Sequence, residues 1–388
     1  MTSAVQKDTW APPRKGSRVK GLPAIAYLLF AISILPPIFM LLPKSYDAEP
    51  LQERRPLAPA VTRWEGRFYN IDGNFRLFQR WFDDHLGLRN FMVRAKNEID
   101  YRVFGTSTRV YYGKHGQIFG RSIADREIPF SEQLLGEPGK IEAIHEGIWK
   151  FTERLQAEGI TPIYVFPYSK QYFLQRDMPL IAPKLKFPTH FQEMNQVLLA
   201  DPRLHVIDTY TPMIPAKAGY QTYLLEDFHW TDASAFTIAK QIVGEISKME
   251  GRPHNVWTNP LVITKEMRQG SEARFAARLF KSPINDASIE VTHKKRPEIK
   301  MDPKTTGFEY QTDMVEDPAL LPPTCLYGNS FSDGMTYAGL PVYFQQFIHL
   351  DRDGLVTNAP ERIKGRCKYL IVQILDLQAG LLNSFTQQ

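Results

Sequence analysis

Residues 141–166, IEAIHEGIWKFTERLQAEGITPIYVF, hold the alternation that decides the fold class. Through the first half of this stretch, apolar side chains recur at helical spacing, at Ile141, Ile144, Ile148, Phe151 and Leu155. This spacing predicts a helix with one buried face, ended at Gly159 because glycine commonly follows a helix. The run PIYVF at 162–166 then predicts a buried strand.

The same alternation continues along the chain. Apolar runs predict strands at 204–207, at 324–327 and within KYLIVQIL at 368–375. Between the first two, Thr231 is placed to cap a helix whose inner face carries Phe236, Ala239, Ile242, Val243 and Ile246. Short buried strands separated by helices predict an α/β fold of three layers, in which helices cover both faces of a parallel sheet. Ahead of this core, residues 110–119 predict a hairpin, and the apolar spacing predicts two helices around Gly87-Leu88-Arg89.

The N-terminal part of the chain is expected to be a membrane anchor. Residues 21–43 are apolar and contain no charged side chain, a length that spans a bilayer. Four cations at positions 14–20 precede this run and Lys44 alone follows it, which places a basic tail, 1–20, in the cytoplasm. No small-x-small cleavage site is near, so an uncleaved anchor is favoured over a signal peptide. Pro36-Pro37 argues against the third interpretation, a buried helix of a soluble domain.

The remaining boundaries follow from composition. Residues 44–63 contain Pro50, Pro56 and Pro59 and predict a linker, and residues 64–388 are expected to form the folded domain. Within that domain, residues 251–320 are polar and proline-dotted and predict an insertion on the core.

Charge and cysteine content limit the function classes. The net charge is +5, and most of the excess lies in the N-terminal tail rather than on the predicted domain, which excludes nucleic acid as a partner. Cys325 and Cys367 are the two cysteines of the chain. An oxidising compartment permits a bridge between them, but two cysteines in so long a chain do not require one, and two buried free thiols are the simpler interpretation.

Candidate chemistry lies beyond the carboxyl ends of the predicted strands, where parallel sheets bind ligands. The first segment is YGNSFS at 327–332, in which a glycine turn would lift Ser330 clear of the sheet and leave backbone N–H groups for an oxyanion. Asn329 is a weaker candidate for the same role. A plain turn with a helix-capping serine is the alternative interpretation of this segment.

The second segment is Asp227-Phe228-His229-Trp230. In an extended chain the side chains of Asp227 and His229 point the same way, so the carboxylate can hold the imidazole as a general base. An exposed Asp-x-His pair without a role is the alternative. Zinc is disfavoured because the sequence lacks the usual ligand spacing, and we expect neither a metal nor another cofactor. A third segment, FPYSKQY at 166–172, offers Lys170 and Tyr172 as further oxyanion or substrate contacts.

Taken together, these segments resemble the SGNH-hydrolase-like O-acetyltransferases of bacterial exopolysaccharide modification, the alginate O-acetyltransferase AlgJ/AlgX-like family. The resemblance covers roughly residues 64–376 and is carried, in the family's order, by FDDHLGLRNFMVRAKNEIDYRVFGTS (82–107), VYYGKHGQIFGRS (110–122), FPYSKQYF (166–173), DFHWTDASA (227–235) and YGNSFSDG (327–334). Its most specific part is the Asp-x-His-Trp segment lying before the Gly-x-Ser-Phe segment. In size and anchoring the chain is more similar to AlgJ than to AlgX. Gln117 and Gln373 depart from the residues common in the family, which weakens alginate itself as the substrate.

The resemblance implies an SGNH-hydrolase-like fold and a triad of Ser330, His229 and Asp227. It implies transfer of acetyl, through a serine acyl-enzyme, to hydroxyls of an exported polysaccharide by a periplasmic domain on a single-pass inner-membrane anchor. The donor partner would be a multi-pass membrane-bound O-acyltransferase. Two alternatives remain open: a carbohydrate acetylesterase using the same triad, and a non-catalytic scaffold of a polysaccharide modification complex.

Overall fold

A computed structural model describes residues 24, 27–31, 51, 56–59, 71–280, 284–290, 300–301, 309–350 and 356–387. By its internal contacts the chain divides into two units, Met1–Val93 and Arg94–Gln388. Helix α2 (Ile71–His85) and helix α3 (Arg89–Ile99) confirm the two helices predicted around residues 87–89. Between them, Leu88 takes a left-handed backbone conformation with φ 60°.

The predicted tail lies outside the described residues, as do most of the predicted linker and, except for residues 24 and 27–31, the predicted anchor. Among the residues that are described, no helix combines the length and the apolar character needed to cross a membrane. The anchor therefore stays a prediction from the sequence.

The unit Arg94–Gln388 is built around a central sheet. In the described part of the chain this sheet has seven strands in the order β4-β3-β11-β9-β10-β8-β7. From β4 to β10 every neighbouring pair is parallel, which confirms the predicted parallel sheet, whereas β8 and β7 add to its edge in antiparallel orientation. The strands are β3 (Thr161–Val165), β4 (Val206–Ile207), β7 (Lys300–Met301), β8 (Tyr310–Gln311), β9 (Thr324–Tyr327), β10 (Phe347–Leu350) and β11 (Tyr369–Gln373).

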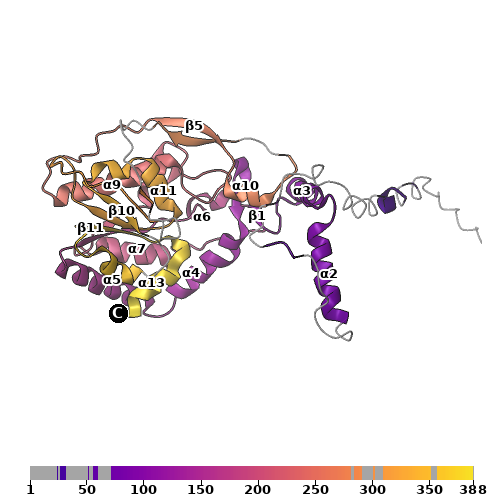
Figure 1. Cartoon of the computed structure of the whole chain (residues 1–388), viewed down its shortest axis with the longest axis horizontal. Helices are drawn as coiled ribbons and strands as arrows, with labels where there is room; N and C mark the ends of the chain where they lie inside the picture. Colours follow the sequence, from indigo (N-terminus) through magenta and orange to yellow (C-terminus); the bar gives the residue numbers. More distant parts are fainter. Residues whose placement is uncertain are drawn as a thin grey trace, which may run out of the picture. The chain divides into compact units, whose positions relative to one another are not determined.

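Side chains of the inner strands alternate between two hydrophobic cores. In β11, Leu370 and Val372 pack into one core, and Tyr369 and Ile371 pack into the other. The first core is covered by helices α5 (Lys140–Ala157), α7 (His190–Ala200) and α13 (Ala379–Leu382), and the second by α9 (Asp232–Met249) and α11 (Ser330–Tyr337). Figure 1 shows these helices on opposite sides of the sheet, which makes the three predicted layers.

The predicted boundaries of several elements are confirmed. Gly159 follows helix α5 with φ 77°, and the Thr231 side chain caps α9 by accepting the N–H of Ser234. The hairpin is formed by β1 (Val110–Tyr112) and β2 (Ile118–Gly120). By contrast, β4 is shorter than the predicted strand 204–207, because Leu204 closes a turn on the carbonyl of Asp201.

The described residues of the segment predicted as an insertion, 251–320, form several elements. It supplies an antiparallel hairpin of β5 (Ile263–Arg268) and β6 (Ile284–Ile289), helix α10 (Ser271–Ala276), and the edge strands β7 and β8. Its basic residues Lys294, Lys295 and Arg296 lie outside the described residues. The other α-helices in the described part of Arg94–Gln388 are α4 (Ile128–Leu135), α6 (Gln171–Leu174), α8 (Pro215–Ala218) and α12 (Ala359–Ile363).

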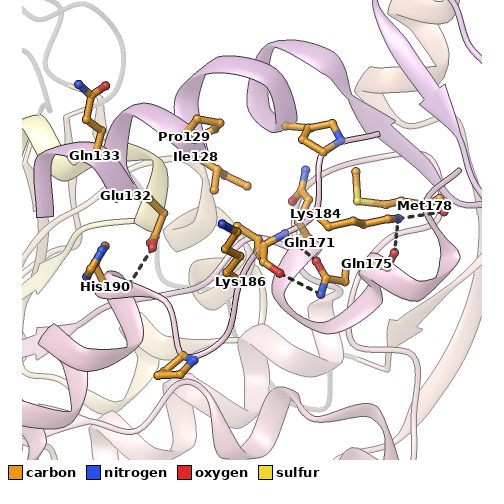
Figure 2. A pocket seen from close by; sticks show the side chains of 14 residues that line it. Ile128, Pro129, Glu132, Gln133, Gln171, Gln175, Met178, Lys184, Lys186 and His190 are labelled. Atoms are coloured by element: carbon orange, nitrogen blue, oxygen red, sulfur yellow. Dashed lines mark hydrogen bonds between the residues drawn. The ribbon is translucent and has the colours of Figure 1, made fainter. Parts of the chain in front are cut away.

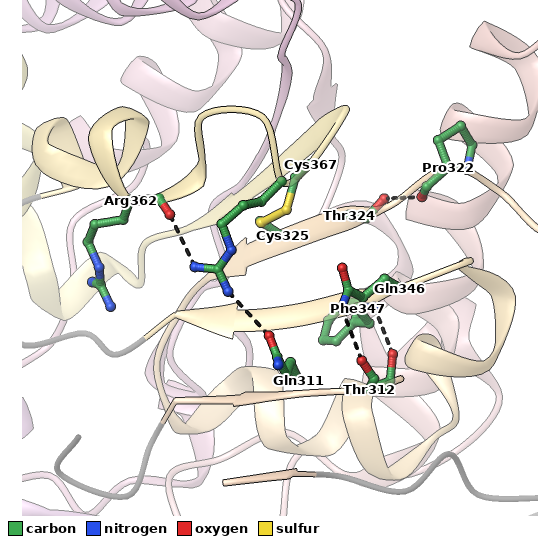
Figure 3. Close-up of a disulfide and its surroundings, with 10 residues drawn as sticks. Gln311, Thr312, Pro322, Thr324, Cys325, Gln346, Phe347, Arg362 and Cys367 are labelled. Atoms are coloured by element: carbon green, nitrogen blue, oxygen red, sulfur yellow. Dashed lines mark hydrogen bonds between the residues drawn. A yellow bond between two sulfur atoms is a disulfide. The ribbon is translucent and has the colours of Figure 1, made fainter. Parts of the chain in front are cut away.

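A disulfide joins Cys325 of β9 to Cys367, two residues before β11 (Figure 3). The simpler expectation of two free thiols was therefore wrong. Cys367 lies just before β11, which pairs with β9, and the two cysteine Cα atoms are 5.8 Å apart, within the usual range for a bridge. The bond fastens the strand that leads to Ser330 to the centre of the sheet.

Candidate active site

Ser330 is the first residue of helix α11, at the carboxyl edge of the sheet. Strand β9 ends at Tyr327, and the chain then turns through Gly328 and Asn329. A Cβ at Gly328 would lie 2.8 Å from Oε1 of Gln373, so a side chain here would push that oxygen away from the N–H of Asn329 that it accepts. The Asn329 side chain accepts the N–H of Phe331 at 2.9 Å and so caps the helix. Ser330 is held half-buried at the beginning of the helix.

His229 links Ser330 to Asp227 through both ring nitrogens. Nε2 lies 2.7 Å from Oγ of Ser330, and Nδ1 lies 2.6 Å from Oδ1 of Asp227. A carboxylate can only accept, so Nδ1 carries the proton of the neutral ring and Nε2 is left to accept from the serine hydroxyl. The structure therefore brings the three predicted triad residues into one hydrogen-bonded chain.

The local backbone that achieves this differs from the expected extended segment. Residues 225–229 form a turn and bends rather than a strand. Oδ1 of Asp227 accepts the backbone N–H of His229 at 3.1 Å as well as its ring proton, so the carboxylate itself closes the turn. This is a common use of aspartate, whose short side chain bonds its own backbone two residues on.

Packing against α11 fixes the loop that carries His229. The indole N–H of Trp230 donates to the carbonyl of Phe331 at 3.0 Å, and the Phe331 ring lies 5.0 Å from the imidazole. At Gly334 a Cβ would lie 2.9 Å from the Cβ of Ala235, so a glycine lets α11 approach α9 closely. Ser330, at the beginning of α11, and His229, in the loop just before α9, are therefore held by two helices that pack directly on each other.

The carboxylate of Asp227 has a second donor, from the segment predicted as an insertion. Its Oδ2 accepts the N–H of Ser271 at 2.8 Å. Gly270 makes this approach possible, since a Cβ there would lie 1.9 Å from the carbonyl oxygen of Glu226. Burial opposes ionisation, but the hydrogen bonds and charge of His229 and the N–H of Ser271 outweigh it and hold the pKa of Asp227 well below its usual range. Asp227 is thus a stable anion behind the imidazole.

Lys170 lies beneath the loop of Asp227 and does not contact Ser330. Its side chain is completely buried, and Nζ donates to the carbonyls of Leu224 and Leu225 at 3.2 and 3.0 Å and to Gln117 at 3.3 Å. Burial lowers the pKa of Lys170 to about 8, against the opposing charge of Glu272, while burial and the charge of Asp227 raise the pKa of Glu272 to about 7. These contacts make Lys170 a support for the loop rather than a substrate ligand.

Tyr172 lies elsewhere, packed on the wall of helix α7. Its ring is buried against Phe191, and its hydroxyl donates to Glu132 at 3.3 Å. The neighbouring cavity, about 430 Å³ in volume, is lined by Glu132, Gln171, Lys184 and His190, among others (Figure 2). None of the triad residues lines it.

The donors available for an oxyanion are few in the first turn of α11. The N–H groups of Phe331 and Ser332 already donate to Asn329. Within the described part of the chain, the N–H of Ser330 has no acceptor, as expected at the first helical position. One amide hydrogen of Asn329 is used by Gln378 at 2.6 Å, which leaves the other for a substrate oxygen.

Sequence reasoning missed two residues that position this site. Gln373, buried in β11, accepts the N–H of Asn329 at 3.2 Å and donates to its side-chain oxygen at 2.9 Å. A lone polar residue in an apolar strand was the signal that could have revealed it. Ser271 acts through its backbone N–H, which every residue but proline possesses, so no sequence signal marks it.

Comparison with known proteins places this geometry in a family. The ALGX family model, described as the SGNH hydrolase-like domain of acetyltransferase AlgX, matches residues 130–353, more than half of the chain and all three residues of the hydrogen-bonded chain. This protein belongs to the ALGX family. The predicted SGNH-hydrolase-like fold and the resemblance to AlgJ and AlgX are therefore confirmed, and the family is one of acetyltransferases.

Solved structures similar to this member of the ALGX family share little sequence with it. The O-acetyltransferase domain of Pseudomonas putida AlgJ is 14% identical with a TM-score of 0.45, covering 72% of this chain and 99% of that domain. Bacillus cereus PatB1 is 12% identical with a TM-score of 0.42, covering 62% and 90%. Pseudomonas aeruginosa AlgX is 14% identical with a TM-score of 0.41, covering 73% and 67%. No curated protein sequence matches the chain at a significant level.

Proposed function

We propose that this protein transfers acetyl groups to hydroxyls of an exported polysaccharide through an acetyl-enzyme on Ser330. The observation that carries the proposal is the continuous hydrogen-bonded chain from Asp227 through His229 to Ser330. This order of carboxylate, imidazole and hydroxyl is what activation of a serine nucleophile requires.

The proposed reaction has two steps. Nε2 of His229 takes the proton of Ser330 as Oγ attacks the carbonyl carbon of an acetyl donor, and the leaving group departs with that proton. A sugar hydroxyl then attacks the carbonyl carbon of the acetyl-enzyme and gives its proton to His229. His229 passes this proton to Oγ of Ser330 as the bond between Oγ and the carbonyl carbon breaks, which regenerates the free serine. Asp227 keeps the ring oriented throughout and stabilises the imidazolium. The N–H of Ser330 and the remaining amide hydrogen of Asn329 are the proposed oxyanion donors.

The proposed location is the periplasmic face of the inner membrane. The basic tail and apolar run at the N-terminus support it, and so does the bridge between Cys325 and Cys367, because disulfides persist mainly in oxidising compartments. Such a compartment lacks cytosolic acetyl donors, so we propose that a multi-pass membrane-bound O-acyltransferase partner supplies the acetyl group.

An assay with the purified full chain tests transfer against hydrolysis. Acetate and acetylated sugar are measured from a chromogenic acetyl ester, with and without oligosaccharide acceptors. We expect an acceptor to gain acetyl at the expense of free acetate, and Ser330→Ala to abolish both products. Ser247→Ala is a matched control, because that hydroxyl donates within α9 to Val243. Acetate release that no acceptor alters would instead identify an esterase.

The scaffold alternative is tested in cells. If polymer acetylation persists at the normal level in cells that carry Ser330→Ala, the serine has no catalytic role. We expect acetylation to be lost while the protein level stays unchanged.

A further inference from the structure

A cavity of about 380 Å³ opens at the turn that precedes the nucleophile. Its wall includes Asn329, the residue before Ser330, together with Gln373 at the end of β11 and Gln378 in the following turn. The lining also includes the apolar side chains of Phe130, Leu377 and Leu381. The cavity is thus built from the same residues that hold the serine in place.

The amide groups of this wall are fixed by one another. Both polar atoms of the Gln373 side chain bond Asn329, and Asn329 in turn donates to Oε1 of Gln378 at 2.6 Å. That same Oε1 accepts the N–H of Leu375 at 3.2 Å. Oε1 of Gln378 thus accepts two hydrogen bonds, whereas its Nε2 has no acceptor among the described residues. The cavity therefore presents an oriented neutral donor.

The chemistry of the whole lining is neutral. No carboxylate, ammonium or guanidinium group lines the cavity in the described part of the chain. Phe130 is 58% exposed, so its ring can pack on the C–H face of a pyranose, while the amides bond sugar hydroxyls. A carboxylate placed here would lose water without gaining a charged partner, which is strongly unfavourable.

We propose that this cavity is the acceptor subsite and that it takes a neutral pyranose rather than a uronate. The inference rests on the proposed function, because the acceptor hydroxyl must reach the acetyl carbonyl carbon on Ser330. A sugar held between Phe130 and Gln378 presents its hydroxyls beside Asn329, next to the acetylated serine.

Binding to matched pairs of oligosaccharides tests this subsite. The full chain, without acetyl donor, is titrated with a mannan and a mannuronan oligosaccharide, and with a cellulose and a glucuronan oligosaccharide. Within each pair the length and linkage are the same and only the carboxylate differs. We expect the neutral member of at least one pair to bind at least about tenfold more tightly.

Two variants assign the binding to this cavity. Gln378→Glu keeps the oxygen that accepts from Asn329 but replaces the donor with a second, charged oxygen, so neutral binding should weaken about tenfold. Gln133→Glu makes the same change in the cavity beside Tyr172 and should leave binding unchanged. Equal affinity for both members of each pair, no binding of any neutral member, or unchanged binding by Gln378→Glu would overturn the proposal.

Transfer assays on the same oligosaccharides separate this inference from the proposed function. Acetylation of the uronates as fast as of the neutral sugars would overturn the subsite and leave transfer intact. Absence of transfer to every acceptor would contradict the proposed function, while the binding comparison would still decide the nature of the cavity.

Discussion

Gly270→Ala should disable the site without touching a triad side chain. The new Cβ would lie 1.9 Å from the carbonyl oxygen of Glu226, whereas Cβ contacts under 3.0 Å are essentially never seen. Either the segment at 270–271 or the backbone at 226–227 must therefore move by at least about 1 Å. Such a displacement lengthens the bond from Ser271 N–H to Asp227 beyond hydrogen-bond range and misaligns His229.

The expected fall in kcat/KM follows from the displacement of Asp227 and His229. Misplacement of a reacting group by about 1 Å can cost about 100-fold in rate. A hydrogen bond to a charged group contributes about 1.5–3 kcal/mol, which is of the same order. We therefore expect kcat/KM on a chromogenic acetyl ester to fall about 100-fold. The reaction of Ser330 with a serine-directed sulfonyl fluoride should slow to a similar extent.

A matched control separates the displacement of Asp227 from any general effect of a glycine-to-alanine substitution on kcat/KM. Gly244→Ala, on α9, meets only the end of the Asn255 side chain, at 2.8 Å, which can move aside. It should keep kcat/KM within about twofold of wild type. If Gly270→Ala folds with an unchanged melting temperature and keeps kcat/KM within about threefold of wild type, the reasoning about Asp227 is refuted.

Three further predictions concern charge and covalent structure. Asp227→Asn should lower kcat on the same ester by about 10³–10⁴-fold, since the wrong histidine tautomer is then held; a loss under tenfold would contradict this role. Burial raises the pKa of Asp376 from 3.8 to about 7, so its contribution to stability is fully present below pH 3.8 and is lost as pH rises through 7. In denaturant unfolding, the free energy of unfolding of Asp376→Asn should therefore rise relative to that of wild type by up to about 4 kcal/mol between these pH values. A difference between the two proteins that does not change with pH would contradict the raised pKa. The double substitution Cys325→Ser and Cys367→Ser should lower the free energy of unfolding by about 3–4 kcal/mol relative to oxidised wild type, because the bridge closes a separation of 42 residues. Relative to wild type whose disulfide has been reduced, the loss should be far smaller. An equal loss relative to both forms would rule out the bond.

Much of the fold followed from hydrophobic spacing. The helix at 141–155, the strands at 162–166 and 369–375 and the cap at Thr231 were predicted because burial on one face or on both leaves a clear pattern. Strand β10 (Phe347–Leu350) was missed, since a short apolar run beside turns gives little periodic signal. The edge strands β7 and β8 were also missed, because two-residue strands leave no pattern.

The site was predicted less completely than the fold. Ser330, His229 and Asp227 were singled out from position, local spacing and family resemblance, and the structure joins them by hydrogen bonds. Lys170 was expected near substrate because it follows a strand, but its side chain turns inward to the carbonyls of Leu224 and Leu225. Position in the chain does not determine which way a long side chain points.

The contribution of residues 251–320 was the least predictable feature. Polar composition indicated an insertion, yet Gly270 and Ser271 come from it and contact the backbone and carboxylate of Asp227. These contacts depend on the backbone of one segment meeting another far away in sequence. A glycine at position 270 permits this contact, but a glycine in the sequence does not indicate which distant segment it will contact.

In the proposed reaction Ser330 carries the acetyl group. Intact-mass analysis of the full chain, quenched early in its reaction with a chromogenic acetyl ester, tests this directly, with peptide mapping to locate the modification. We expect one acetyl group per chain, on Ser330, which disappears when an oligosaccharide acceptor is added and reappears as an ester on the sugar. Acetyl on another residue, or transfer to sugar that persists in Ser330→Ala, would contradict it.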